Sequence, residues 1–159
     1  GEMKDVTEEV TVLTEKGEIK TLKREELKMG YRTSIIAEKG YLVLEAVLQL
    51  TDGDRNEIRA MMEDLKKKRI SKQPLEYPSA GSTFKRPKGY FAGKLIMDAG
   101  LRGFQVGGAQ VSEKHCGFVI NTGDATAEDV TELIRQVAER VKAQSGVTLE
   151  PEVKLLGEF

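Results

Sequence analysis

The alternation of hydrophobic and polar residues predicts β-strands in the first fifty residues. Val10 and Val12 stand in a strand-like run that ends at a Gly-containing turn, residues 15–18, and a second run follows at residues 19–22. This spacing predicts a β-hairpin. The segment YLVLEAVLQL at residues 41–50 is apolar on both faces, which predicts a central strand of a sheet.

Two longer segments have the spacing of helices. Asp54 followed by Glu57 is typical of a capping box, and apolar residues then recur until the basic run at residues 66–69. These apolar residues are Ile58, Met61, Met62 and Leu65. A second helix is predicted to begin at Thr126, with Asp129 at its third position, and to end at Gly146. Its apolar stripe consists of Val130, Leu133, Ile134, Val137 and Val141.

Between residues 74 and 93 the chain is rich in proline, glycine, serine and aromatic residues. This composition favours turns over regular elements and predicts a domain boundary near Glu76. Gly107 and Gly108 lie inside a strand pattern, which indicates a bulge or a close backbone approach. The second half is predicted to be a small α+β unit. Its elements are a short helix around residues 94–99 and strands around residues 104–111, 117–121 and 147–156.

Composition narrows the class of protein. A chain of 159 residues with 39% hydrophobic and 32% charged residues fits one or two small domains. Its apolar runs are far shorter than the roughly 20 residues of a membrane span, and no signal-like segment opens it, so we expect neither membrane insertion nor secretion. The single cysteine, Cys116, excludes an internal disulfide and a paired-cysteine metal site, which indicates a reducing cytoplasm.

Charge is unevenly distributed along the chain. The formal net charge of -1 argues against a general nucleic-acid binder. Residues 66–102, however, carry ten lysines and arginines against only Glu76 and Asp98. This segment would favour an anionic ligand.

Several residues are candidates for chemistry. Residues 79–87 combine small residues and hydroxyls with Lys85 and Arg86, a pattern that suits a phosphate or carboxylate but also an ordinary linker. Arg32 could hold a substrate carboxylate or make only a surface ion pair. If Glu152 were buried near another acid or an apolar ligand, its pKa would rise and it could donate a proton.

Other catalytic arrangements are disfavoured. His115 and Cys116 are adjacent in sequence, and adjacent side chains on a strand point to opposite faces, so a Cys–His nucleophile is a poor interpretation. Ser82 lacks the Gly-x-Ser-x-Gly elbow of many hydrolases, and one histidine with scattered acids lacks the spacing of a zinc site. No GxGxxG or Walker A sequence occurs. We therefore expect no metal site.

Four segments together resemble the MurB family, the UDP-N-acetylenolpyruvoylglucosamine reductases. They are YRTS at residues 31–34, QPLEYPSAGSTFKRP at 73–87, AGKLIMDAGLRGFQVGGAQVSEKHCGFVIN at 92–121 and LEPEVKLLG at 149–157. The resemblance implies an α+β protein: residues 1–75 as the C-terminal half of a PCMH-like FAD-binding domain with antiparallel strands, and residues 76–159 as the substrate-binding domain. The family's glycine-rich FAD-pyrophosphate cradle would precede Gly1, so we expect a fragment that is inactive alone and colourless when purified.

The resemblance also implies an activity for the parent enzyme. It would be a cytoplasmic flavoenzyme that uses FAD and NADPH to reduce UDP-N-acetylenolpyruvoylglucosamine to UDP-N-acetylmuramate for peptidoglycan. Arg32 would hold the substrate carboxylate, Glu152 would assist there, and Ser82 would deliver a proton to the neighbouring carbon. Lys85 is a candidate cation beside Ser82. Further substrate contacts are expected from Arg86, His115 and Lys154, and an FAD phosphate contact from Arg69.

Two other functions are compatible with parts of the sequence. One is a non-catalytic module that binds a nucleotide sugar or a polyanion through residues 66–102, for which binding would fall steeply with salt. The other is a different flavoprotein with a related FAD domain, which the strong match in the second half disfavours. The tyrosine-bearing substrate loop of one MurB subclass is not recognisable between Leu65 and Pro74. The sequence gives no oligomeric state.

Overall fold

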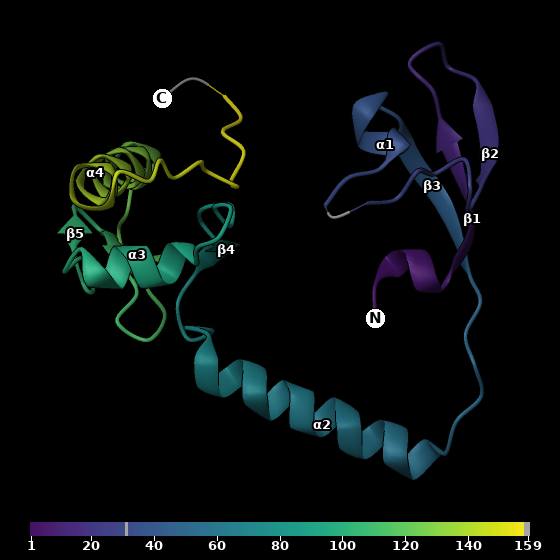
Figure 1. Ribbon diagram of the computed structural model, residues 1–159, viewed down its shortest axis with the longest axis horizontal. Helices are drawn as coiled ribbons and strands as arrows, with labels where there is room; N and C mark the ends of the chain where they lie inside the picture. The colour runs from purple at the N-terminus through teal and green to yellow at the C-terminus, as the bar shows by residue number, and fades with distance from the viewer. Residues whose placement is uncertain (31, 158–159) are drawn as a thin grey trace. The chain divides into compact units, whose positions relative to one another are not determined.

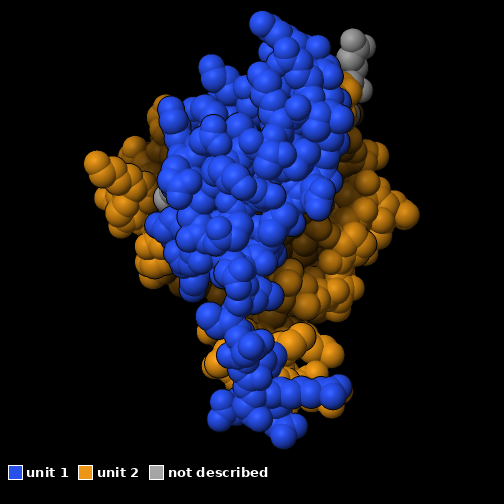
Figure 2. Space-filling model, turned by 90° about the vertical axis from the view of Figure 1, so that its right-hand side faces the viewer, with its two compact units in different colours: residues 1–58 blue, residues 59–159 orange. Residues whose placement is uncertain are grey.

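Residues 1–30 and 32–157 are described by the computed structural model. Contacts between Cα atoms divide the chain into unit 1, residues 1–58, and unit 2, residues 59–159, which Figure 2 shows in different colours. This division falls within a helix, whereas the expected boundary between ligand-binding domains lies near residue 76. That functional boundary stays a prediction.

Unit 1 is built on a three-stranded antiparallel sheet with the order β2-β1-β3 (Figure 1). The predicted hairpin is confirmed, with Leu13 opposite Ile19 and Thr11 opposite Thr21. Val10, Val12 and Leu27 form its small buried core. The strands are β1 (Thr7–Leu13), β2 (Ile19–Lys23) and β3 (Leu42–Leu48), and the helices are a 3-10 turn (Met3–Asp5) and α1 (Ile35–Glu38).

β3 differs from its prediction. It was expected in the centre of a sheet, but among the described residues it pairs only with β1 and lies at the sheet edge. All seven residues of β3 are exposed, with Leu42 64% and Val43 54% accessible. An apolar pattern on both faces indicates a strand that can be covered on both sides, but it does not say which segments cover it.

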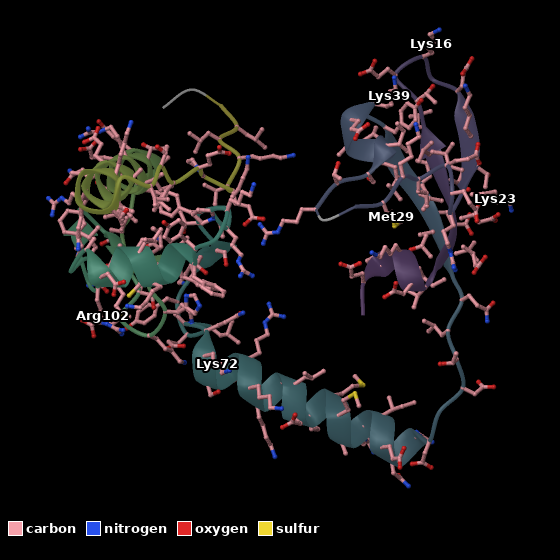
Figure 3. All side chains as sticks on the ribbon, viewed as in Figure 1. Lys16, Lys23, Met29, Lys39, Lys72 and Arg102 are labelled. Atoms are coloured by element: carbon pink, nitrogen blue, oxygen red, sulfur yellow. The ribbon has the colours of Figure 1, made fainter. Side chains whose placement is uncertain are left out.

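Helix α2 (Arg55–Lys72) begins where the sequence predicts. Asp54 accepts hydrogen bonds at Oδ1 from the backbone N–H groups of Asn56 (2.9 Å) and Glu57 (3.0 Å), which caps the helix. None of its residues is buried, and Figure 3 shows side chains projecting along its length as far as Lys72. In the part of the chain that the structure describes, no helix is sufficiently long and apolar to span a membrane.

Unit 2 places two helices on a four-stranded antiparallel sheet with the order β4-β7-β6-β5 (Figure 1). The predicted α4 is confirmed: Thr126 Oγ1 accepts from the Asp129 N–H at 3.1 Å, and Gly146 ends the helix with φ 72°. The apolar stripe of α4 packs into the core of the unit. Besides most of α2, the elements of unit 2 are β4 (Ser79–Ser82), β5 (Gln105–Val106), β6 (Ala109–Val111), β7 (Phe118–Asn121), α3 (Ala92–Asp98) and α4 (Ala127–Ser145).

Three predictions for unit 2 need correction. Residues 104–111 form the β5–β6 hairpin rather than one strand, because the chain turns at Gly107 and Gly108. Ser79–Ser82, expected as a turn region, pairs with β7 as strand β4. Residues 147–156 form no strand but a single bridge between Phe84 and Pro151, flanked by the backbone hydrogen bonds Lys85 N–H to Glu150 and Glu152 N–H to Thr83.

Candidate active site

Ser82 lies exposed at the end of β4, opposite Phe118 of β7. The pairing shifts register between Ser79 and Ser82, and Gly81 adopts φ 83° within this interval. A residue with a side chain rarely adopts this conformation, so the glycine permits the bulge. The bulge therefore fixes how the backbone presents Ser82.

Thr83 connects Ser82 to two other segments. It is 3% exposed, its N–H donates to the Gly117 carbonyl at 2.9 Å, and its Oγ1 accepts from the Val119 N–H at 3.0 Å. Its own carbonyl accepts from the Glu152 N–H at 2.8 Å. The structure thus places the backbones of Ser82 and Glu152 on neighbouring segments, although they are far apart in sequence. Sequence reasoning missed Thr83, whose only signal is a hydroxyl residue beside the predicted proton donor.

We expect Thr83→Val to destabilise unit 2 by about 1–3 kcal/mol, because the buried Val119 N–H loses its acceptor. Urea titration followed through the amide signals of α4 measures the change. Thr131→Val is the matched control, since the Thr131 hydroxyl bonds only to the Glu128 carbonyl on a more exposed face of α4. Equal stability of the Thr83 and Thr131 variants would contradict the linking role of the Thr83 hydroxyl.

Lys85 lies two residues after Thr83 and bonds to the same C-terminal segment. Its N–H donates to the Glu150 carbonyl at 2.8 Å, and its Nζ lies 3.1 Å from Glu150 Oε2. The ammonium is therefore engaged by a carboxylate beside the Phe84–Pro151 bridge. The suggestion that Lys85 assists Ser82 stays a prediction.

Arg32 belongs to unit 1 and has a strained backbone. Its φ of 57° is unusual for a residue other than glycine, and two backbone hydrogen bonds between Gly30 and Thr33 close the turn around it. Such strain is often found at functional sites. Arg32 lines a cavity of about 410 Å³ together with Met29, Thr33 and Ser34. Tyr31 of the same motif lies outside the described residues.

Arg86 and His115 each have an ordered contact. The Arg86 guanidinium stacks 4.1 Å from the ring centre of Phe91 and donates through Nε to the Tyr90 carbonyl at 3.4 Å. His115 Nδ1 accepts from the Gly117 N–H at 3.1 Å, so a neutral His115 carries its proton on Nε2. The His115 ring also packs edge-on against the Phe118 ring, with the ring centres 5.0 Å apart, and both side chains are largely exposed to solvent.

The remaining candidates are more isolated. Lys154 is exposed in the C-terminal segment, and Arg69 is exposed on α2, where its Nε donates to Gln73 Oε1 at 3.1 Å. The structure brings Ser82, Glu152 and Lys85 into one set of paired segments of unit 2. Their meeting with Arg32 of unit 1 stays a prediction, as do the assigned roles. Residues 1–30 and 32–157 contain no group of three or more His, Cys, Asp or Glu side chains that could hold a metal ion.

Comparison with known proteins gives consistent matches. The family model for "UDP-N-acetylenolpyruvoylglucosamine reductase, C-terminal domain" matches residues 73–156. UDP-N-acetylenolpyruvoylglucosamine reductase from Agathobacter rectalis is 64% identical over 159 residues, which are 100% of this chain and 51% of that protein. The protein of the same name from Exiguobacterium sibiricum is 57% identical over 99% of this chain and 52% of its own length.

A solved structure agrees with these relatives. The crystal structure of UDP-N-acetylenolpyruvylglucosamine reductase (MurB) from Thermus caldophilus matches with a TM-score of 0.81 and 37% identity, over 97% of this chain and 54% of that one. The chain thus spans about half the length of the curated relatives that it matches.

Proposed function

The chain belongs to the UDP-N-acetylenolpyruvoylglucosamine reductase family, and from this premise we propose that it takes part in the reduction of that nucleotide sugar to UDP-N-acetylmuramate. The reaction would use FAD and NADPH and would serve peptidoglycan synthesis. The observation that supports this proposal best is the hydrogen bond between the Thr83 carbonyl and the Glu152 N–H, which joins the backbone of Glu152 to the residue that follows Ser82. A proton donor and an assisting acid would then lie on adjacent segments.

Among the described residues we propose one contact to FAD. Arg69 presents an exposed guanidinium, a group that binds phosphate oxygens with charge-assisted hydrogen bonds. One cation does not form a complete phosphate cradle, so Arg69 is proposed as a single contact. When bound, reduced FAD would supply the hydride for the enolpyruvyl group.

Side chains of this chain would stabilise the negative charge that develops on the substrate and would supply the proton that completes the reduction. Hydride addition to the terminal carbon leaves an enolate beside the substrate carboxylate. Arg32 would hold that carboxylate and stabilise the developing negative charge, and Glu152, when protonated, would donate a hydrogen bond to the same oxygens. Ser82 would then give a proton to the neighbouring carbon, acting as a general acid toward a strongly basic enolate.

A hybrid enzyme tests this proposal. The chain is joined to the part of the Agathobacter rectalis relative that it does not span, and NADPH oxidation is followed with and without UDP-N-acetylenolpyruvoylglucosamine. We expect substrate-dependent oxidation and formation of the lactyl ether, identified by mass spectrometry. The unmodified relative is the positive control. A folded hybrid that contains FAD but oxidises NADPH without forming the lactyl ether would contradict the proposed function.

A further inference from the structure

His115 lies in the turn between β6 and β7, where its ring is held against the backbone of Gly117. The Gly117 N–H donates to His115 Nδ1 at 3.1 Å. A Cβ atom at Gly117 would lie 2.9 Å from His115 Cε1, so any side chain there would displace the ring. Gly93 of α3 packs against the same place, because a Cβ at Gly93 would lie 3.1 Å from the Gly117 nitrogen. The hydrogen bond and the two glycines therefore fix the ring and Gly117 relative to each other.

The backbone of this turn is closed by its own hydrogen bonds. The buried Ser112 hydroxyl accepts from the N–H groups of Lys114 at 3.2 Å and His115 at 3.3 Å. The His115 carbonyl accepts from the Phe118 N–H at 3.0 Å, and the Phe118 carbonyl accepts from the Ser112 N–H at 2.9 Å. His115 thus has an ordered backbone from which its ring restrains Gly117.

Residues 117–119 in turn position the segment that carries Ser82. Phe118 stands opposite Ser82 in the ladder between β4 and β7. The Gly117 carbonyl accepts from the Thr83 N–H at 2.9 Å, and the Val119 N–H donates to Thr83 Oγ1 at 3.0 Å. Among the described residues β4 pairs only with β7, so the placement of Ser82 depends on this one neighbour. A displacement of Gly117 would reach Ser82 through a single backbone hydrogen bond.

From these contacts we propose that His115 is a positioning residue for Ser82: its Nδ1 holds Gly117, and Gly117 holds the segment that presents the proton donor. The inference rests on the proposed function for the role of Ser82. It gives His115 an indirect role through Nδ1, whereas the expected substrate contact would have to use the other ring nitrogen, Nε2. A misplacement of about 1 Å at a reacting group can cost about 100-fold in rate, so a small restraint on Gly117 is sufficient.

Two substitutions of His115 separate its ring nitrogens. Asparagine places an oxygen acceptor near the position of Nδ1 and commonly accepts from the N–H group two residues further on, but it is too short to reach the position of Nε2. Glutamine brings an N–H donor near the position of Nε2 and places no acceptor at that of Nδ1. His115→Asn should therefore keep the hold on Gly117, and His115→Gln should lose it. His115→Leu removes both nitrogens.

Stopped-flow absorbance of the flavin in the hybrid enzyme measures the effect on the reaction. His115→Leu and His115→Gln should slow flavin reoxidation by the enolpyruvyl substrate about 10- to 100-fold, with flavin reduction by NADPH unchanged and the substrate Kd within about twofold. His115→Asn should restore most of this loss. Glu113→Leu, an exposed substitution in the same turn, is the control and should change neither half-reaction. Rescue by glutamine instead of asparagine, or a weaker Kd with an unchanged reoxidation rate, would show a direct contact through Nε2 and overturn the proposal.

Amide hydrogen exchange in the purified chain tests the positioning without any flavin chemistry. The Thr83 N–H should exchange about tenfold faster in the leucine and glutamine variants of His115 than in the asparagine variant, while the amides of α4, which report unfolding of unit 2, keep their rates. Unchanged exchange at Thr83 in the leucine variant would overturn the inference. Inactivity of the hybrid enzyme with the expected exchange pattern would remove the proposed reaction, while the hold of His115 on the Ser82 segment would stand.

Discussion

Replacing Ser82 with alanine is expected to slow oxidation of the reduced flavin by the enolpyruvyl substrate about 100- to 10,000-fold, the usual contribution of a general acid. Flavin reduction by NADPH should keep its rate, because that step requires no proton at the substrate carbon. Alanine removes one oxygen atom at an exposed end of β4, so the fold should be retained.

The two half-reactions can be measured separately by stopped-flow absorbance of the flavin in the hybrid enzyme. Ser79→Ala is the matched control, since it removes a second exposed hydroxyl from the same strand. In this control, the rates of flavin reduction and of flavin reoxidation should both equal those of the unmodified hybrid. If Ser82→Ala slows flavin reduction as much as reoxidation, or slows neither, Ser82 is not the proton donor.

Elements with local signals could be predicted from the sequence. Thr126 and Asp129 satisfy the first N–H groups of α4, Gly146 supplies the left-handed residue at its end, and the apolar stripe between them is buried. The β1–β2 hairpin likewise depends on a turn and two neighbouring runs. In both cases the residues that determine the element are close together in the chain.

Elements that depend on distant partners were predicted less well. β3 has the composition of a buried central strand, but its position in a sheet is set by which strands lie beside it. Ser79–Ser82 has turn-forming composition and becomes a strand because β7 offers it hydrogen-bonding groups. At the other end, the expected final strand is reduced to one bridge, because among the described residues only 83–85 pair with it.

The candidate site shows the same distinction. Ser82, Arg32 and Glu152 could be proposed from motifs, but the contact that joins two of them could not. It depends on the Thr83 carbonyl meeting the Glu152 N–H, a pairing that local sequence does not encode. The positive φ of Arg32 was also outside the reach of the sequence, since arginine has no preference for that conformation.

Gly108→Ala is expected to be the most destabilising small substitution in unit 2, at about 3 kcal/mol or more. A Cβ atom there would lie 2.4 Å from the Ala125 nitrogen and 2.7 Å from its Cα, and backbone atoms cannot yield as a flexible side chain can. The same turn is tied to α4, because Asp129 Oδ2 accepts from the Thr126 N–H at 3.0 Å and the Gly108 N–H at 3.2 Å. The hydrogen bond from the Thr126 N–H, and after it the one from the Gly108 N–H, lowers the pKa of Asp129. Because the added methyl group has no room beside Ala125, it would force the β5–β6 turn away from the start of α4.

Urea unfolding followed through the amide signals of α4 gives the free energy of unfolding of unit 2. Gly123→Ala is the control, because a Cβ at Gly123 meets no atom within 4 Å, and its stability should stay within about 0.5 kcal/mol of the unmodified chain. A Gly108→Ala chain as stable as the control would mean that the β5–β6 turn and the residues before α4 are not packed as described. That result would also count against the described position of Ser82, because β6 pairs with β7, and β7 pairs with β4, the strand that ends at Ser82.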